Sequence, residues 1–196
     1  MVDYGGHTAL IVVDIQNDFA DPQGSLYVRG GEEVVERANR EIQAAEAGGA
    51  LVVYTQDWHP PVTPHFAKDG GIWPVHCVVG SWGAQLHPDL QVVGSAETVK
   101  VGAGGEDGYS GFSMRSVDTG EEHSTGLGDL LRARGIEGVV VVGLATDYCV
   151  KETALDALRL GFATTVVSDA VAAVDLGPGD GARALEELRT AGADVR

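Results

Sequence analysis

Four consecutive valines at positions 139–142 constrain the fold of this chain more than any other stretch. An uninterrupted run of β-branched residues is typical of a strand that is buried on both faces, as in a parallel sheet. Apolar residues then recur at helical spacing from Val150 to Leu160, and Gly161 stands where a helix would end. A buried strand that leads into an amphipathic helix indicates an α/β fold.

Strands and helices alternate along the rest of the chain. Strands are expected at residues 8–14, 50–56, 98–101, 139–143 and 163–168. Helices are expected at residues 32–47, 127–134 and 181–191, and a further helix begins after Thr146 or Asp147 and ends before Gly161. This alternation predicts one α/β domain over residues 1–196, with a mainly parallel β-sheet flanked by helices on both faces in a Rossmann-like three-layer sandwich. Because ligands bind beyond the carboxyl ends of the strands in this architecture, polar residues that follow strands are candidates for function.

The excess of acidic over basic residues limits the kinds of molecule that this chain can bind. Asp and Glu total 29 against 13 Lys and Arg, which gives a formal net charge of −16. Such a charge argues against nucleic acid or an anionic membrane as a partner, but it says nothing about catalysis. A small-molecule substrate is the expected partner on other grounds given below, and a homo-oligomer is compatible with the sequence. Two cysteines cannot form a disulfide framework, and there is no signal peptide or apolar run of membrane-spanning length. We therefore expect a reducing, cytoplasmic setting.

A single cysteine, Cys149, falls in the first turn of the helix after the valine strand, behind Thr146 or Asp147 as the N-cap. Free N–H groups and the helix dipole at that place favour the thiolate, which is the nucleophilic form. For one cysteine taken alone, packing as a small apolar side chain is the commoner role. The choice between these roles depends on the neighbours of Cys149.

Two further polar residues stand where strands end, namely Asp14 at the end of the first strand and Lys100 at the end of the third. In a parallel sheet both would reach the edge at which Cys149 lies. A carboxylate that takes the thiol proton and an ammonium that favours the thiolate would activate Cys149 as a nucleophile. Taken singly, Asp14 is a common turn residue and Lys100 a common surface charge, so the trio is suggestive but not specific.

Residues 57–94 break the alternation, with several prolines and glycines and no periodicity. An irregular stretch of this length is usually either functional or disordered, and its aromatic and histidine content argues against disorder. The segment carries Asp57, His59, His65 and His76, a donor set that suits a divalent Zn, Fe or Mn ion. Packing within a polar loop is the alternative for any one histidine, and it weakens for four candidate ligands in one segment.

Several aromatic residues lie close to these motifs in the sequence. Phe19, Trp73 and Tyr109 are candidates for the walls of a flat aromatic binding site. For Trp58 and Trp82, packing within the core or a loop is the expected role.

The chain resembles the isochorismatase-like cysteine hydrolases, and among them the nicotinamidases of the pyrazinamidase type. The matching stretches follow the family's order over most of the chain: ALIVVDIQNDF, YTQDWHPPVTPHF, WPVHCVVGSWGAQLHP, YSGFSM and VVVVGLATDYCVKETALDA. The stretch DIQNDF alone would mark only the superfamily, whereas the combination is highly specific.

This resemblance implies a role for each candidate residue. The catalytic triad and the metal ligands that it implies are Asp14, Lys100 and Cys149, and Asp57, His59, His65 and His76. It also implies a cis peptide before Ala145, whose N–H forms an oxyanion hole with the N–H of Cys149. Phe19 and Trp73 match the ring-stacking positions of the family.

One position departs from the family pattern. The lysine of the family is usually followed directly by glycine, whereas Val101 stands between Lys100 and Gly102 in this chain. No other lysine lies nearby in the sequence, so Lys100 is the predicted third member of the triad.

The resemblance further implies hydrolysis of nicotinamide to nicotinate and ammonia through a thioester, with pyrazinamide as a second substrate. One alternative is a related cysteine amidohydrolase that acts on carbamoyl or ureido substrates and lacks the metal cluster. An isochorismatase proper would lack the cysteine. A non-catalytic scaffold would have no reactive thiol, and a structural zinc protein would need a closed, cysteine-rich shell.

Overall fold

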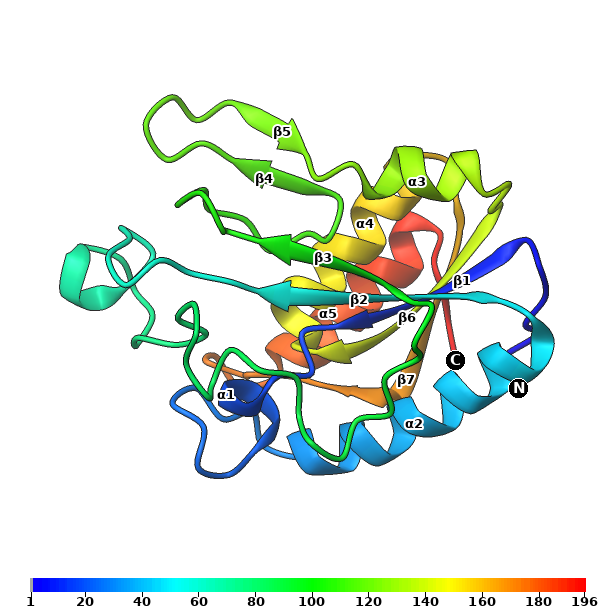
Figure 1. Ribbon diagram of the computed structural model, residues 1–196, viewed down its shortest axis with the longest axis horizontal. Coiled ribbons are helices and arrows are strands. Elements are labelled where there is room, and N and C mark those ends of the chain that lie inside the picture. The colour runs from blue at the N-terminus through cyan, green and yellow to red at the C-terminus, as the bar shows by residue number, and fades with distance from the viewer. Residues whose placement is uncertain (1) are drawn as a thin grey trace.

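A six-stranded sheet forms the centre of the computed structural model, which describes residues 2–196 (Figure 1). The strands lie in the order β3-β2-β1-β6-β7-β8, and every neighbouring pair is parallel. Their bounds are β1 Thr8–Val13, β2 Leu51–Asp57, β3 Glu97–Val101, β6 Gly138–Leu144, β7 Ala163–Ala172 and β8 Asp194–Val195. The predicted parallel α/β sheet is confirmed.

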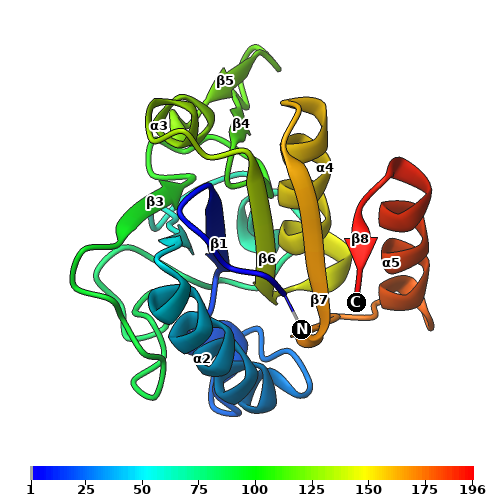
Figure 2. The ribbon, with the colours of Figure 1, turned by 90° about the vertical axis from the view of Figure 1, so that its right-hand side faces the viewer.

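Helices cover both faces of this sheet (Figures 1 and 2). The helix α2 (Gly31–Gly48) packs against one face. The opposite face is covered by α3 (Leu127–Ala133), α4 (Lys151–Arg159) and α5 (Asp180–Ala191). The predicted three layers follow from the sequence pattern, because strands that are apolar at successive positions need a covering layer on each side.

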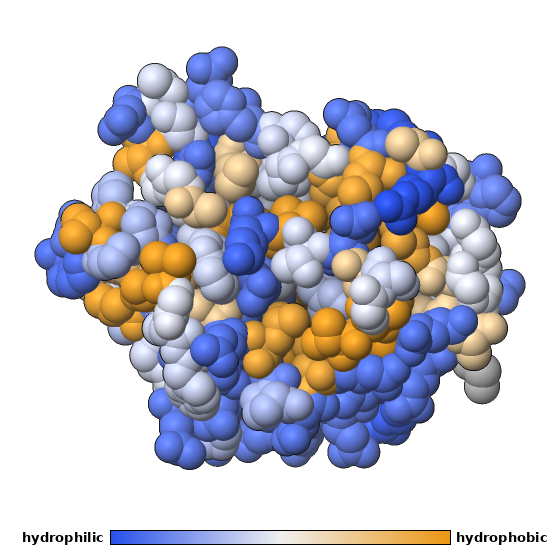
Figure 3. All heavy atoms as spheres, in the orientation of Figure 1, coloured by the Kyte–Doolittle hydropathy of each residue, from blue (hydrophilic) through white to orange (hydrophobic). Residues whose placement is uncertain are grey.

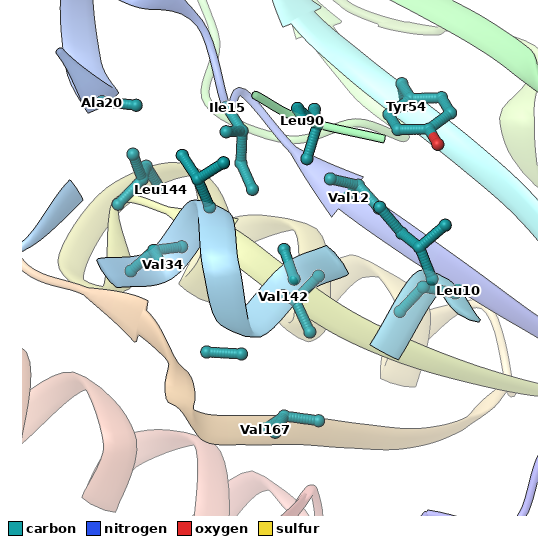
Figure 4. Close-up of a cluster of buried hydrophobic side chains, with 14 of the residues drawn as sticks. Leu10, Val12, Ile15, Ala20, Val34, Tyr54, Leu90, Val142, Leu144 and Val167 are labelled. Atoms are coloured by element: carbon teal, nitrogen blue, oxygen red, sulfur yellow. The ribbon is translucent and has the colours of Figure 1, made fainter. Parts of the chain in front are cut away.

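Successive side chains of the middle strands point alternately to the two helical layers. Leu10 and Val12 of β1 pack with Val142 of β6 and Val34 of α2 on one face (Figure 4). Ile11 points to the other face and is fully buried there. Because burying one such side chain is worth roughly 1.5–3 kcal/mol, these layers fix the middle strands and the residues that follow them.

Some elements were not predicted from the sequence. β7 continues to Ala172, past the predicted end at residue 168. A short antiparallel hairpin joins β4 (Ser113–Arg115) to β5 (Glu122–Ser124), and a one-turn helix, α1 (Asn17–Ala20), follows β1. The hairpin strands are largely exposed and polar, so they lack the apolar alternation by which strands are identified.

The segment between β2 and β3 is ordered mainly by isolated backbone bridges. One bridge pairs His59 with Val78, and a single 3-10 turn, η1 (Ala67–Asp69), lies farther along. Figure 3 shows apolar atoms at the end of the molecule formed by this segment, where Val62 and Ile72 are 70% and 72% exposed. The inner part of the segment lies along the carboxyl edge of the sheet, where the functional residues were predicted.

Candidate active site

Cys149 lies in a π-helical turn, η2 (Thr146–Val150), which connects β6 to α4. The peptide bond between Leu144 and Ala145 is cis, as the resemblance implies. The N–H of Ala145 donates a hydrogen bond to Sγ of Cys149. The sulfur is therefore held at the carboxyl end of β6, and the residue remains partly accessible.

Asp14 follows β1 and faces the same sulfur. Its φ of 48° lies in the left-handed region, which aspartate tolerates better than most residues. Oγ1 of Thr55 donates to its Oδ1 at 2.6 Å, and the Cys149 thiol is hydrogen-bonded to the same carboxyl group. Burial, and after it the charge of Asp57, raises the pKa of Asp14 to about 7. Such a group can accept the thiol proton and return it near neutral pH.

The protonation of Cys149 differs from the prediction. Burial raises the pKa of the thiol well above its usual value, and the charges of Asp14 and Asp57 raise it further. The expected preference for the thiolate was wrong for the resting site, because these effects outweigh those of the helix start. Asp147, one of the two predicted caps, instead accepts backbone hydrogen bonds from the loop after β7 at 3.0 and 2.9 Å.

The predicted metal ligands lie together beside this pair. Ligand atoms of His59, His65 and His76 are all within 4.8 Å of one another. Nε2 of His59 lies 2.8 Å from Oδ1 of Asp57, and Nε2 of His76 lies 3.0 Å from Oδ2. Burial alone would raise the pKa of Asp57, but its contacts with the imidazoles outweigh burial and hold that pKa well below its usual range. Asp57 is thus a carboxylate at neutral pH.

His59 shows most directly why the cluster suits a cation. Its side chain is buried, and neither ring nitrogen has an aligned hydrogen-bond partner among residues 2–196. The short contact with Asp57 does not count, because it lacks the alignment of a hydrogen bond. Unpaired buried polar atoms are costly, and a divalent metal ion would satisfy a set of three imidazoles and one carboxylate. The residues present therefore fit such an ion.

Groups behind the histidines fix their orientation. Nδ1 of His65 lies 2.9 Å from Oδ1 of Asp107, and Nδ1 of His76 lies 2.7 Å from the carbonyl oxygen of Pro74. These contacts leave the other ring nitrogen of each histidine for the cluster, which is the usual arrangement behind a metal-binding imidazole. Asp107 was not predicted, because nothing in its glycine-rich loop links it to a histidine 42 residues away.

Two residues of the stretch DIQNDF support the site from behind. The side chain of Gln16 bonds both the N–H and the carbonyl of Asp57, at 2.8 and 2.7 Å. Asp18 accepts the N–H of Cys77 at 2.7 Å and that of Ser25 at 3.0 Å. Both residues were missed, and the available signal was their polarity within a motif that follows a buried strand.

One pocket is lined both by Asp14 and Cys149 and by residues of the histidine cluster. Its walls include the rings of Phe19, Trp73, Tyr109 and Tyr148. Nε1 of Trp73 donates to the Tyr109 hydroxyl at 3.0 Å, and the Trp73 ring meets Tyr148 edge-on with centroids 4.9 Å apart. The predicted aromatic residues thus line the pocket, and their role in binding stays a prediction. Tyr148 was missed, although it adjoins Cys149 in the sequence.

Lys100 is not brought to this pocket. Its side chain is exposed, and Nζ lies 3.7 Å from the centroid of the Trp58 ring. Val101, the next residue, is buried and lines the pocket instead. The expectation that Lys100 meets Asp14 and Cys149 was wrong, because successive residues of a strand point to opposite faces of the sheet.

Comparison with known proteins agrees with this geometry. A family model, the isochorismatase domain, matches residues 8–196. The nicotinamidase of Escherichia coli (strain K12) is 41% identical, with 95% of this chain and 93% of that protein covered. The nicotinamidase/pyrazinamidase of Mycobacterium tuberculosis is 42% identical, with 95% and 97% covered.

A solved structure shares the fold over the same extent. The crystal structure of the pyrazinamidase of Pyrococcus horikoshii in complex with zinc has a TM-score of 0.87 and 37% identity, and the match covers 97% of this chain and 98% of that one. The family match and the fold together extend over nearly the whole sequence. The chain belongs to the isochorismatase family.

Proposed function

We propose that this chain is a nicotinamidase, a metal-dependent cysteine amidohydrolase that converts nicotinamide to nicotinate and ammonia and also deamidates pyrazinamide. The observation that carries the proposal is a single pocket. It brings together the Cys149 thiol, which is hydrogen-bonded to the carboxyl group of Asp14, a cluster of imidazoles with one carboxylate, and aromatic walls. The similarity to the nicotinamidases of E. coli and M. tuberculosis supports the same class of substrate.

Asp14 acts first as a general base. It accepts the proton of the Cys149 thiol along their hydrogen bond while the sulfur forms a bond to the carboxamide carbon. The electron pair of the carbonyl double bond moves to the oxygen. In this proposal the N–H groups of Ala145 and Cys149 donate to this oxyanion, and one such donor is worth roughly 2.7–4 kcal/mol.

Asp14 then acts as a general acid. It gives its proton to the departing nitrogen, the C–N bond breaks, and ammonia leaves a thioester on Cys149. A water molecule attacks the thioester carbon as Asp14 takes its proton. The C–S bond breaks, the sulfur recovers the proton from Asp14, and the released acid ionises to nicotinate.

Asp57, His59, His65 and His76 would hold one divalent ion, which we propose to be Zn, Fe or Mn. When bound, that ion supplies a Lewis acid that can orient the substrate through its ring nitrogen. The unpaired nitrogens of His59 and the zinc in the P. horikoshii structure support this assignment. The aromatic walls of the pocket are suited to hold the faces of a planar ring.

We place the enzyme in the cytoplasm, where its two free cysteines would stay reduced. Among residues 2–196, no helix is both long and apolar enough to cross a membrane. Its partner would be a small aromatic amide, and the negative charge of the chain disfavours nucleic acid.

The test combines a metal analysis with an activity assay. Purified protein should contain about one divalent ion per chain and release ammonia from nicotinamide and pyrazinamide. Cys149→Ala should abolish this release while its thermal unfolding remains cooperative, since no other group supplies the nucleophile. Retained activity in that variant would contradict the mechanism.

The same assay separates the alternative function. Ammonia release from carbamoyl or ureido substrates, with none from nicotinamide, would identify a related amidohydrolase instead. His59→Ala should lose both the ion and the hydrolysis of nicotinamide, and an enzyme that is indifferent to this change would favour the alternative.

A further inference from the structure

We propose that Asp14 and Cys149 work as a two-residue catalytic pair without a lysine or arginine partner, because Val101 and not Lys100 lines the pocket that the thiol faces. This inference rests on the function proposed above and specifies how its nucleophile is activated. In this inference the apolar side chain of Val101 keeps a charged side chain of β3 away from the thiol, and Lys100 takes no part in the reaction.

The register between β2 and β3 determines which residue of β3 faces the thiol. Asp57 pairs with Val101, and Gln56 pairs with Lys100. Paired residues of neighbouring parallel strands point to the same face of the sheet, and the next residue of each points to the other. Asp57 and Val101 both line the pocket. Lys100 therefore points to the opposite face of the sheet, together with Gln56, and its own side chain is exposed there.

Contacts on the face of the sheet opposite the pocket hold Lys100 in place. Its ammonium lies over the Trp58 ring, in the geometry of a cation–π interaction. The Trp58 N–H donates to the carbonyl of Val101 at 2.8 Å, which fixes the end of β3 against the chain that follows β2. A slip by one residue would bring Lys100 to the pocket but would also move Val101 into solvent. The lysine cannot reach the thiol by a change of rotamer alone.

Among residues 2–196, the side chains that face the thiol carry no permanent positive charge, so any cation beside it would be the divalent ion proposed above. Besides Cys149, the titratable side chains on the pocket wall are Asp14, Asp57, His65, His76, Tyr109 and Tyr148. No lysine or arginine lines the pocket in the described part of the chain, residues 2–196. The two imidazoles are already engaged, His65 with Asp107 and His76 with Asp57. Burial and the two carboxylates keep the pKa of the thiol high.

This charge pattern has a chemical consequence. The thiolate does not accumulate before substrate binds, and the proton passes from Sγ to Asp14 as the S–C bond forms. A lysine at position 101 would bring an ammonium into the pocket that both groups line. An opposite charge within about 4–6 Å lowers the pKa of an acid by about 1–3 units. In such a variant the pKa of the Cys149 thiol should therefore be lower, and a larger fraction of Cys149 should be thiolate near neutral pH, than in the natural chain.

The rate at which iodoacetamide alkylates Cys149, followed by mass spectrometry as a function of pH, tests the proposal without any substrate. The full-length protein is used as isolated, with its metal. Cys77 is fully buried, so its alkylation in the same sample reports unfolding. Lys100→Gln should leave the profile unchanged. Val101→Lys should lower the midpoint by at least about one unit and speed the reaction near neutral pH about tenfold, because the added ammonium favours the thiolate.

The matched control is Val101→Met, which adds length without charge and should show no such shift. A tenfold slower reaction in Lys100→Gln would mean that this ammonium reaches the thiol, and the proposal would be overturned. A folded Val101→Lys variant that behaves like Val101→Met would also overturn it. If Val101→Lys unfolds, the Lys100→Gln result still decides. Wild-type protein that gives the expected profile but releases no ammonia from nicotinamide would contradict the proposed function and leave the pair intact.

Discussion

The middle of the sheet and its edge contribute to the site in different ways. β1 and β6 have a helical layer against each face, and Ile11 and Val141 near their centres are fully buried. β3 is an edge strand, where partly buried and exposed residues alternate up to the buried Val101, and Lys100 is exposed. A residue that follows a middle strand is surrounded by protein whichever way it points. On β3, by contrast, neighbouring residues have different surroundings: Val101 lines the pocket, whereas Lys100 is exposed to solvent.

The largest effect is expected at the middle of the sheet. Asp14→Asn keeps the size of the side chain and an acceptor for Thr55, but it removes the base that takes the thiol proton. We expect kcat/KM for nicotinamide to fall about a thousandfold, measured as ammonia release. A loss below about tenfold in a folded variant would mean that the base comes from elsewhere, and the contrast between middle and edge would no longer hold.

The same substitution should stabilise the protein above neutral pH. Burial, and then the charge of Asp57, raises the pKa of Asp14 to about 7, so the folded state holds this proton more tightly than the unfolded chain does. The resulting stabilisation is complete below the unfolded pKa of about 4 and is lost as the pH rises through 7. Asparagine has no such proton to lose.

The advantage of Asp14→Asn in thermal unfolding should therefore grow between about pH 4 and about pH 7, stay level above that, and reach a few kcal/mol in the free energy of unfolding. Melting temperatures of both proteins across this range provide the measurement. A difference that does not change with pH would show that the carboxyl group is not held in the buried environment of a middle strand.

A smaller effect is expected from the loop that follows the edge strand. Asp107→Ala removes the group that orients His65, so we expect the affinity for the metal ion to fall about 10–100-fold, measured by competition with a chelator. Asp118→Ala, on the exposed turn between β4 and β5, is the matched control and should change nothing. Equal affinity in the two variants would mean that the edge region contributes nothing to the metal cluster.

The parts of the fold and site that could be predicted are those fixed by the middle strands. The valines at 139–142 can be stable only between two helical layers, so the sheet and the places of Asp14 and Cys149 followed from local pattern. The proposed ligands Asp57 and His59 could be predicted for a related reason. They directly follow a buried strand, in a segment whose composition departs from the rest of the chain.

The features that were missed depend on contacts between distant segments. Lys100 was assigned to the site because its strand leads there, but the face to which it points depends on the register of β3 against β2. The pKa of Cys149 depends on two carboxylates from other strands, and the orientation of His65 depends on Asp107. Neither relation leaves a periodic signal in the sequence.

The smallest effect is expected on the outer face of the edge strand. Lys100→Ala removes the ammonium from the Trp58 ring, an exposed cation–π contact worth about 0.5–1 kcal/mol, so the melting temperature should fall by about 1–4 °C. Activity on nicotinamide should stay within about twofold of wild type, because no group of the reaction touches this side chain. A double-mutant cycle with Trp58→Leu measures the contact itself, since the loss from Lys100→Ala should disappear once the ring is absent. The opposite pattern, unchanged stability with a large loss of activity, would place the ammonium in the pocket and remove the distinction between the middle of the sheet and its edge.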